Sequence, residues 1–465
     1  MCRLLFALLP LLAVSCVPSL DGNPPREPNR EVPASFGAAT AAAPGATDLF
    51  HAPELRALVD AALRNNQELN IRLQEVIVAR NEVYARRGEY LPKVRAGAGA
   101  GVERVGKNTS QGASDEDHGL PEDLGDFQFG LSGSWEIDVW KKLRNAAAAA
   151  DLRYRATIEA RRFLVTQIVA EIARSYYELI GIDNQLDVLA RNIEVQASAL
   201  EVVKLQKQAA RTTELAVQRF EAEVLKNKSR RYELEQERVQ TENRINFLVG
   251  RYPQPVKRDA AAFKDTLPVV ASGLPSELLE NRPDVRRAEL ALRASKLDVE
   301  VAKAAFYPSL SIEAGAGYRA FNARHLLSTP DSVVYNLAGN LTAPLLNRQA
   351  IAAQYRTANA LQIEAVVDYE RTLLQAFTDV VNQLALVDNL QKSYELKEQE
   401  VATLARSVEI SNILFQSARA DYMEVLLTRR DSLEAEMTLV ETRKAQLQAS
   451  VGVYQALGGG WRQGN

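Results

Sequence analysis

Residues 165–200 run VTQIVAEIARSYYELIGIDNQLDVLARNIEVQASAL, inside a stretch from Ala146 to Glu214 that contains no proline and a single glycine, Gly181. Apolar side chains recur at every seventh position, a period typical of helices packed in a coiled coil. They are Val165, Ile172, Leu179, Leu186, Ile193 and Leu200. At 1.5 Å per residue we expect one helix on the order of 100 Å long, longer than a compact domain.

A second series of apolar residues has the same period of seven. It consists of Val366, Leu373, Val380, Val387, Tyr394, Val401, Val408 and Phe415. Adding 208 to a residue number in the first series gives a member of the second, as with Val165 and Leu373 or Leu200 and Val408. The sequence therefore predicts an internal two-fold repeat of a long helical unit.

Charge and motif content exclude several classes of function. The 56 basic and 59 acidic residues give a net charge of −3, which provides no positive field for nucleic acid or anionic lipid. The sequence has no cysteine pair, phosphate-binding loop or nucleophile motif, and its three histidines (His51, His118 and His325) are scattered. We therefore predict no enzyme activity, no cofactor, no metal site and no nucleic acid partner.

The N-terminus is typical of an exported lipoprotein. In residues 1–15, Arg3 precedes the apolar run Leu4 to Val14, which is too short to span a bilayer and indicates a signal peptide. Small and apolar residues precede Cys16 in a pattern similar to a bacterial lipobox, so we predict lipidation of Cys16; ordinary cleavage nearby is the alternative. Residues 16–52 are rich in Pro, Ala and Gly, and we expect an extended tether there.

Two segments change the apolar period from seven to two, which is typical of β-strands. In the first, Val94, Ala96, Ala98, Ala100 and Val102 alternate with glycine and charged residues. We predict a β-hairpin at 94–138, with an acidic loop, and a second hairpin at 309–344. Each strand then has one apolar face and one mostly small or polar face.

Two interpretations of these strands remain open: a small sheet packed on a helix, or part of a membrane barrel wall. A strand length near ten and aromatic residues near the strand ends (Phe127, Trp135, Tyr318 and Tyr335) favour the barrel. A barrel in lipid has no free edges and at least about eight strands. Four strands cannot close, so at least two chains would share one barrel.

The predicted boundaries follow the repeat. A first helix begins near Pro53 and continues to about Tyr90, where Pro92 stops it. The first repeat, 53–262, consists of that helix, the hairpin 94–138, a long helix 140–208 and a return helix 212–249. The second repeat, 263–465, consists of a helix 283–307, the hairpin 309–344, a long helix 346–417 and a return helix 420–457.

Six short motifs in order resemble those of the TolC-like outer membrane factors. They are residues 135–140 (WEIDVW), 247–253 (FLVGRYP), 274–279 (LPSELL), 282–286 (RPDVR), 305–308 (AFYP) and 456–461 (ALGGGW). The resemblance covers nearly the whole chain after the tether. It is closest to the lipoprotein subgroup that works with pumps of the resistance-nodulation-division (RND) class.

The resemblance implies a mainly α fold with a membrane β element. Three chains would form a homotrimer in outer membrane lipid, giving four strands each to a 12-stranded barrel and their long antiparallel helices to a coiled-coil barrel in the periplasm. The channel would pass drugs or other small toxic compounds from an inner-membrane RND pump and a periplasmic adaptor to the exterior. Two alternatives remain: a type I protein-secretion exit duct, and a structural periplasmic coiled-coil lipoprotein without a lumen.

The resemblance also implies positions for contact and gating. The helical turns would form adaptor-contact tips, at Ala210, Arg211, Ala418 and Arg419, with alanine where the family commonly has glycine. Glu424 matches an acidic position that constricts the periplasmic entrance, and Leu427 occupies the next such position. The alternatives are a solvated helix acid at Glu424, a hydrophobic constriction at Leu427 and ordinary surface arginines at the tips.

Overall fold

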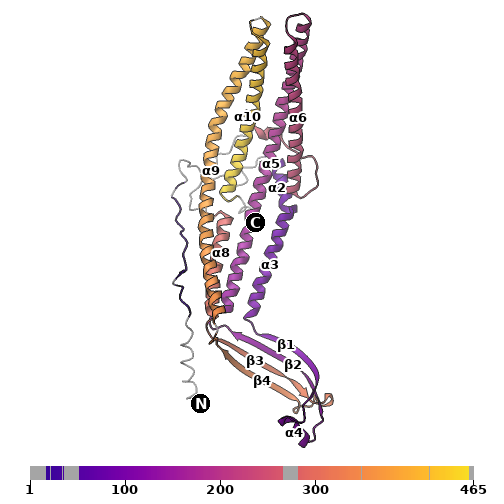
Figure 1. Ribbon diagram of the computed structural model, residues 1–465, viewed down its shortest axis with the longest axis vertical. Coiled ribbons are helices and arrows are strands. Elements are labelled where there is room, and N and C mark those ends of the chain that lie inside the picture. The colour runs from indigo at the N-terminus through magenta and orange to yellow at the C-terminus, as the bar shows by residue number, and fades with distance from the viewer. Residues whose placement is uncertain are drawn as a thin grey trace. The chain divides into compact units, whose positions relative to one another are not determined.

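The computed structural model describes residues 17–20, 22–33, 35, 52–264, 281–346, 348–417 and 419–459 (Figure 1). These residues are mostly helical, with one antiparallel sheet of four strands, as the sequence predicted. The chain divides into two compact units. Unit 1 comprises residues 1–28, 76–156 and 289–368, and unit 2 comprises residues 29–75, 157–288 and 369–465.

The first helical segment is divided at Asn66, where a single helix was expected. Helix α2 (Pro53–Asn65) ends there and α3 (Gln67–Glu89) begins. The side-chain oxygen of Asn66 accepts a hydrogen bond from the backbone N–H of Leu69 at 3.0 Å, and its amide donates to the carbonyl of Leu248 at 2.8 Å. Asn66 therefore caps α3, as short polar side chains commonly do.

The two seven-residue apolar series lie in α5 (Lys142–Gln208, 67 residues) and α9 (Gln349–Gln416, 68 residues). A return helix follows each of them, α6 (Glu214–Val249) after α5 and α10 (Tyr422–Ala456) after α9. Ile172 and Leu179 of α5 are fully buried and Leu200 is 7% exposed, each in an apolar cluster of unit 2. The apolar period therefore marks the packed side of the helix.

Gly181, the one glycine in α5, makes room for a side chain of α10. A Cβ added at Gly181 would lie 2.8 Å from the Cδ of Lys444, so the lysine stem occupies that space. The Lys444 ammonium reaches Glu178 at 2.9 Å. The glycine thus permits an ion pair between α5 and α10.

The two predicted hairpins join into one sheet with the order β1-β2-β3-β4. The strands are β1 (Lys93–Arg104), β2 (Asp123–Ile137), β3 (Ser309–Ala320) and β4 (Val333–Thr342). The join is the antiparallel pairing of β2 with β3, which puts Trp135 opposite Ile312. Helix α4 (Ser110–Asp117) and the 3₁₀ turn η4 (Ala323–His325) lie in the connections.

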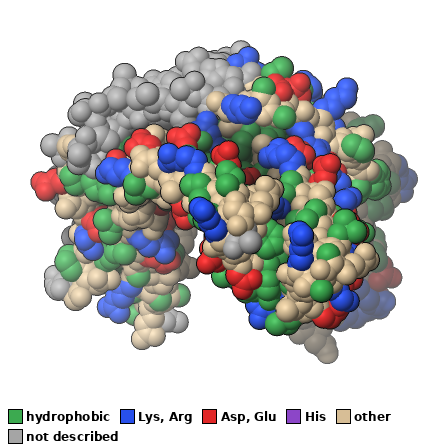
Figure 2. Space-filling view, turned by 90° about the horizontal axis from the view of Figure 1, so that it is seen from above, with side chains coloured by type: hydrophobic (Ala, Val, Ile, Leu, Met, Phe, Trp, Pro, Cys, Tyr) green, Lys and Arg blue, Asp and Glu red, His purple; other side chains and the backbone are tan. Residues whose placement is uncertain are grey.

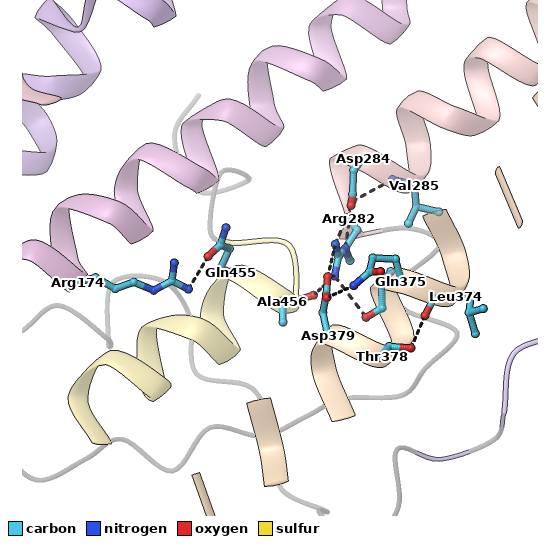
Figure 3. A network of polar contacts seen from close by, with 11 residues as sticks. Arg174, Arg282, Asp284, Val285, Leu374, Gln375, Thr378, Asp379, Gln455 and Ala456 are labelled. Atoms are coloured by element: carbon cyan, nitrogen blue, oxygen red, sulfur yellow. Dashed lines mark hydrogen bonds and ion pairs between the residues drawn. The ribbon is translucent and has the colours of Figure 1, made fainter. Parts of the chain in front are cut away.

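Two arginines, one buried and one partly exposed, join the helices of unit 2 near the ends of α6 and α10. Arg282 precedes α8 (Pro283–Ala304), and its guanidinium pairs with Asp284 at 2.7 Å and Asp379 at 3.2 Å and donates to the carbonyl of Ala456 at 3.0 Å (Figure 3). Burial alone would lower the pKa of Arg282, but the two carboxylates raise it above its ordinary value. The guanidinium of Arg282 therefore connects the start of α8, the helix α9 and the end of α10.

A second arginine performs a similar role beside α6. Arg258, ahead of the 3₁₀ turn η2 (Ala260–Phe263), pairs with Asp183 of α5 at 2.5 Å and with Glu242 of α6 at 2.6 Å. Burial alone would lower its pKa, and again the two carboxylates raise it. The Arg258 side chain is 19% exposed, whereas that of Arg282 is 5% exposed.

Candidate functional site

The strand register places the apolar side chains of all four strands on one face of the sheet. Directly opposed residues of an antiparallel pair point to the same side, and Ala98 lies opposite Phe129, which lies opposite Tyr318. We call this side the apolar sheet face. Besides alanine and glycine it consists of Val94, Val102, Phe127, Phe129, Leu131, Trp135, Ile137, Leu310, Ile312, Tyr318, Val333, Tyr335, Leu337 and Leu341.

The apolar sheet face is largely uncovered within the chain. Val102 is 73% exposed, Leu337 78% and Tyr335 85%, and every residue of β1 and β4 is exposed. A sheet packed on a helix would bury these side chains. The first of the two interpretations of the strands is therefore not what unit 1 contains.

The opposite side, which we call the polar sheet face, carries charged, amide, hydroxyl and glycine residues. Arg319 of β3 forms two hydrogen bonds with the carboxylate of Asp126 of β2, at 2.8 and 2.9 Å. A Cβ on Gly130 would lie 2.6 Å from the carbonyl oxygen of Ala316, so only glycine fits there. Alternation of residue type thus gives the sheet two chemically different sides.

Two tryptophan side chains lie where strand β2 leads into helix α5. Trp135 donates its indole N–H to the carbonyl of Tyr90 at 3.1 Å, and Trp140 donates to that of Pro308 at 2.8 Å while stacking on Tyr307 at 4.7 Å. Indoles that combine an apolar ring with one satisfied donor are typical of a membrane–water interface.

Asp138 links β2 to α5. Its carboxylate accepts from the backbone N–H groups of Leu143 at 3.1 Å and Arg144 at 2.9 Å. Burial alone would raise the pKa of Asp138, but these hydrogen bonds and the Arg144 guanidinium lower it below its ordinary value. The WEIDVW motif therefore fixes the start of the long helix.

The turn between α5 and α6 uses a left-handed residue. Ala210 has φ 57°, and the backbone N–H of Arg211 donates to the carbonyl of Gln206 at 2.8 Å. This is the usual hydrogen bond of a helix C-terminus followed by a left-handed residue. Thr213 then caps α6 by accepting from the backbone N–H of Ala216. Ala210 and Arg211 are both exposed.

The turn between α9 and α10 repeats the backbone hydrogen bond 208 residues later, with a different capping contact. The backbone N–H of Arg419 donates to the carbonyl of Leu414 at 2.9 Å, and Asp421 caps α10 by accepting from the N–H of Tyr422 at 2.6 Å. We call residues 200–224 the first tip, and residues 408–417 with 419–432 the second tip. Figure 2 looks onto the end of the molecule that carries these turns, where Lys and Arg side chains are interspersed with Asp, Glu and hydrophobic ones.

The two predicted gate residues lie on one face of α10. Glu424 and Leu427 are three positions apart, so they are neighbours on the helix surface, and both are exposed. Ala216, 208 residues before Glu424, is instead fully buried in the cluster of the first tip. The acidic residue is therefore presented by the second tip and has no counterpart on the surface of the first.

Arg429 of the second tip was not identified from the sequence. Its Nη2 donates to the side chain of Asn412 at 2.9 Å, while Nε and Nη1 are buried and have no partner among the described residues. Burial lowers the pKa of Arg429 below its ordinary value. The only clue in the sequence is a charged residue on the side of α10 that faces α9, where an apolar one would pack.

Three further predicted features concern the residues that the structure describes. Within them, no group of three or more His, Cys, Asp or Glu side chains is placed to hold a metal ion. Among the same residues, no helix has the combination of length and apolar content that crossing a membrane requires. Cys16, Ala418, His51 and the motif at 274–279 lie outside the described residues.

Comparison with known proteins gives consistent matches over most of the chain. A family model described as "Outer membrane efflux protein" matches residues 58–251 and 274–459. The chain is 30% identical over 419 residues to the pyoverdine export outer membrane protein OpmQ of Pseudomonas aeruginosa, covering 89% of this chain and 86% of OpmQ.

Two further comparisons concern a lipoprotein and a solved channel. The chain is 25% identical over 421 residues to the probable outer membrane lipoprotein SilC of Salmonella typhimurium, covering 90% of this chain and 88% of SilC. The solved outer-membrane channel OprN has the same fold, with a TM-score of 0.85 at 22% identity over 95% of this chain and 99% of that one.

Proposed function

We propose, from the premise that this chain belongs to the outer membrane efflux protein family, that it is the exit channel of a tripartite efflux system. The family places the chain in the outer membrane, and its relatives are channel proteins rather than enzymes. The pump would be an inner-membrane protein of the RND class, connected to the channel by a periplasmic adaptor. The observation that carries the proposal is the uncovered apolar sheet face.

The apolar sheet face would contact lipid. Burying a large apolar side chain is favourable by roughly 1.5–3 kcal/mol. Leu337 and Tyr335 lack most of this stabilisation within the chain because they are largely exposed. The strands have 10 to 15 residues, enough to cross the hydrocarbon at a tilt. The polar sheet face would then line the lumen.

The sheet edges explain why several copies are needed. In the described chain β1 and β4 each pair on one side only, and an unpaired edge in hydrocarbon leaves backbone groups without partners. Because β1 and β4 run in opposite directions, β4 of one copy can pair antiparallel with β1 of the next. We propose a homotrimer with a 12-stranded barrel.

The helices also leave apolar surface for other copies. On α6, Leu225, Tyr232 and Val239 recur every seven residues and are 59%, 70% and 45% exposed. A seven-residue stripe of this kind is typical of a helix with a coiled-coil partner. The long helices of the three copies would cover such stripes and form the periplasmic tunnel. The equal hydrogen bonds of the two turns support the proposed internal repeat.

The tunnel entrance would lie at the turns. Three copies of Glu424 around a narrow opening would favour cations, because like charges in a constriction attract counter-ions. Arg211 and Arg419, both exposed, would contact the adaptor together with the alanines at 210 and 418. Recording the cation preference in planar bilayers tests the gate: Glu424→Gln should reduce the preference, and an unchanged preference would exclude Glu424 from the constriction.

Cargo and anchoring follow from different observations. The polar sheet face suits hydrophilic or amphipathic small molecules, and OpmQ is named for export of pyoverdine. Lipidation of Cys16 is supported by the lipobox-like sequence and by SilC, which is named a lipoprotein. A strain lacking this protein should be hypersensitive to several dyes, detergents, antibiotics or metal salts. Unchanged sensitivity with loss of a secreted protein would favour a type I secretion duct.

One pair of adjacent substitutions tests the membrane wall. Leu337→Arg puts a charge in the middle of β4 on the apolar sheet face, at a cost of about 2–4 kcal/mol per chain if that face meets lipid. Ala338→Arg puts the same charge on the polar sheet face, opposite Glu313, where it should be tolerated. We expect loss of trimer and conductance only for Leu337→Arg. Equal behaviour of the two variants, or no conductance in the parent, would support a lipoprotein without a lumen.

A further inference from the structure

One arginine of the polar sheet face lies in a row without acidic residues. Arg95 of β1 is opposite Ser132 of β2, which is opposite Gly315 of β3, and Gly315 is opposite Asn336 of β4. We call these four residues the arginine row. Arg95 is exposed and forms no ion pair with any residue that the structure describes. The row therefore carries one positive charge, hydrogen-bond donors on Ser132 and Asn336, and no carboxylate.

Two ion pairs neutralise other charged residues of the polar sheet face. Arg319 binds the carboxylate of Asp126, as described above, and Lys142 of α5 pairs with Glu136 at 2.5 Å. Asp126 is six positions along β2 from Ser132. At about 3.4 Å per residue this separation is roughly 20 Å, beyond the screening length of about 8–10 Å at physiological salt. Neither carboxylate therefore neutralises the arginine row.

The acidic residue nearest to the arginine row has a lysine in its own row. Glu313 of β3 and Lys93 of β1 both lie opposite Ser134 of β2, so the two charges face each other across one strand. Arg95 is one row further from Glu313. The last acidic residue of this face, Glu103, is eight positions along β1 from Arg95. Arg95 is thus the residue of this face whose charge is least compensated.

The next row of the polar sheet face has almost no side chains. It consists of Gly97, Gly130, Gly317 and Val334. A Cβ on Gly317 would lie 2.3 Å from the carbonyl oxygen of Phe129, so this position, like Gly130, accommodates only glycine. A solute can therefore approach the arginine row from this side without displacing a neighbouring side chain.

Assembly into a barrel would not supply the missing acidic residue. In the proposed barrel, β1 has β2 on one side and β4 of the next copy on the other. The sequence of β4, VVYNLAGNLT, contains no charged residue, so no register of this pairing puts a carboxylate beside Arg95. Rotational symmetry would place the arginines of all copies at one level of the lumen.

We propose that the arginine row forms an anion-binding ring in the lumen, and that the cargo consists of small molecules with carboxylate or phosphate groups. This inference rests on the proposed channel function. Arg95 is the specificity-determining residue, because a guanidinium binds either group through two parallel hydrogen bonds. Ser132 and Asn336 can donate further hydrogen bonds. A ring of charge in a pore selects ions of the opposite sign, so Arg95 would act in series with Glu424 and with opposite preference.

The ion preference of channels in planar bilayers tests the ring. Arg95→Gln should lower the chloride-to-potassium permeability ratio at least about twofold, because the local anion concentration falls. Arg104→Gln is the matched control, since it removes the same charge from the same strand but on the opposite face of the sheet. It should leave the ratio unchanged. Arg95→Lys keeps the charge and should keep the ratio near that of the parent protein.

Citrate, an anion with three carboxylates, tests binding separately from ion preference. It should block the current through the parent channel. Half-block of Arg95→Gln should need at least about tenfold more citrate, because charge-assisted hydrogen bonds are lost. Glucose, which is neutral, should block neither protein.

The outcomes distinguish the ring from the channel. The ring would be overturned by a conducting parent that citrate does not block, by an unchanged ion preference in Arg95→Gln, or by equal changes in Arg95→Gln and Arg104→Gln. Each of these results leaves the proposed channel intact. A folded parent protein without conductance would instead overturn the channel function and the ring together.

Discussion

The first and second tips have the same backbone contacts and different cores. In the first tip Leu200, Val203, Phe220 and Val224 are all buried in one apolar cluster. The residues 208 positions later in the second tip are smaller or more polar: Val408, Ser411, Thr428 and Ser432. A half-buried Arg429 lies there too, and two of its nitrogens have no partner within the part of the chain that the structure describes. The second tip therefore has less apolar contact to hold its helices together.

The order is reversed at the C-terminal ends of α6 and α10, which we call the bases of the two helix pairs. Arg282, which ties α8 to α9 and α10, is almost fully buried and contacts two carboxylates and two carbonyls. Arg258, which ties α5 to α6, is partly exposed. The helices α5 and α6 are thus held together mainly by apolar packing at the first tip, whereas α9 and α10 are held together mainly by the contacts of Arg282. A pair fixed at the base and loosely packed at the tip is suited to movement at the tip, where Glu424 is presented.

The largest expected effect concerns the base of α9–α10. Arg282→Met should destabilise the fold by about 3–5 kcal/mol, because it leaves Asp284 and two carbonyls buried without their partner. Arg258→Met, the matched change at the other base, should cost less because solvent can reach its carboxylates. Chemical denaturation of the purified protein measures both. Equal losses in the free energy of unfolding for the two variants would contradict the proposed difference between Arg282 and Arg258.

The next largest effect is a difference in stability between the first and second tips. Phe220→Ala should destabilise the first tip by about 3–5 kcal/mol, since a fully packed aromatic side chain is lost. Thr428→Ala at the equivalent position of the second tip removes little buried area and should stay within about 1 kcal/mol. Amide hydrogen exchange at the two turns measures local opening. Similar protection losses in the two variants would contradict the comparison.

A smaller effect of opposite sign is expected at Arg429. The folded state holds its pKa below the ordinary value, so folding is opposed at every pH below that pKa, and the cost disappears only as the pH rises through it. The whole physiological range lies where the cost applies. Arg429→Met should therefore stabilise the second tip by about 1 kcal/mol. Slower hydrogen exchange near residues 410–430 would support this, and faster exchange would show that the guanidinium has a partner in the assembled protein.

The smallest effect tests the turn of the first tip. A left-handed conformation costs a non-glycine residue roughly 1–2 kcal/mol, and Ala210 adopts it with φ 57°. Ala210→Gly should relieve about 0.5–1 kcal/mol after the added flexibility of the unfolded chain is deducted. The melting temperature should rise slightly, and a lower one would mean that the Ala210 methyl group makes a stabilising contact.

Periodic features were predictable from the sequence, whereas contacts between residues far apart in the chain were not. The seven-residue series correctly identified Ile172, Leu179 and Leu200 as packed residues, and the two-residue alternation identified the apolar sheet face. The break at Asn66 was missed because its capping contacts involve Leu248, which is far away in sequence. Helix α4 was missed because its sequence, SQGASDED, has no apolar period.

The candidate site was only partly predictable for the same reason. The gate role of Glu424 stays a prediction drawn from a family position, whereas the burial of Ala216 depends on how α5 packs against α6. The hydrogen bonds that Asn23 and Arg26 make with α9 were not predictable, because proline-rich composition favours an extended chain whether or not it is bound. Their partners, Asn359 and Gln362, are more than 330 residues away.

The number of strands contributed by each chain has a consequence for assembly. Since four is even, the first and last strands are antiparallel, and copies can be joined side by side without any parallel seam, however many there are. Strand pairing by itself would accept a ring of two, three or four subunits. In the proposed barrel the stoichiometry would therefore be selected by the angle at which neighbouring helical surfaces fit, so that substitutions on the exposed stripe of α6 should change the diameter of the pore.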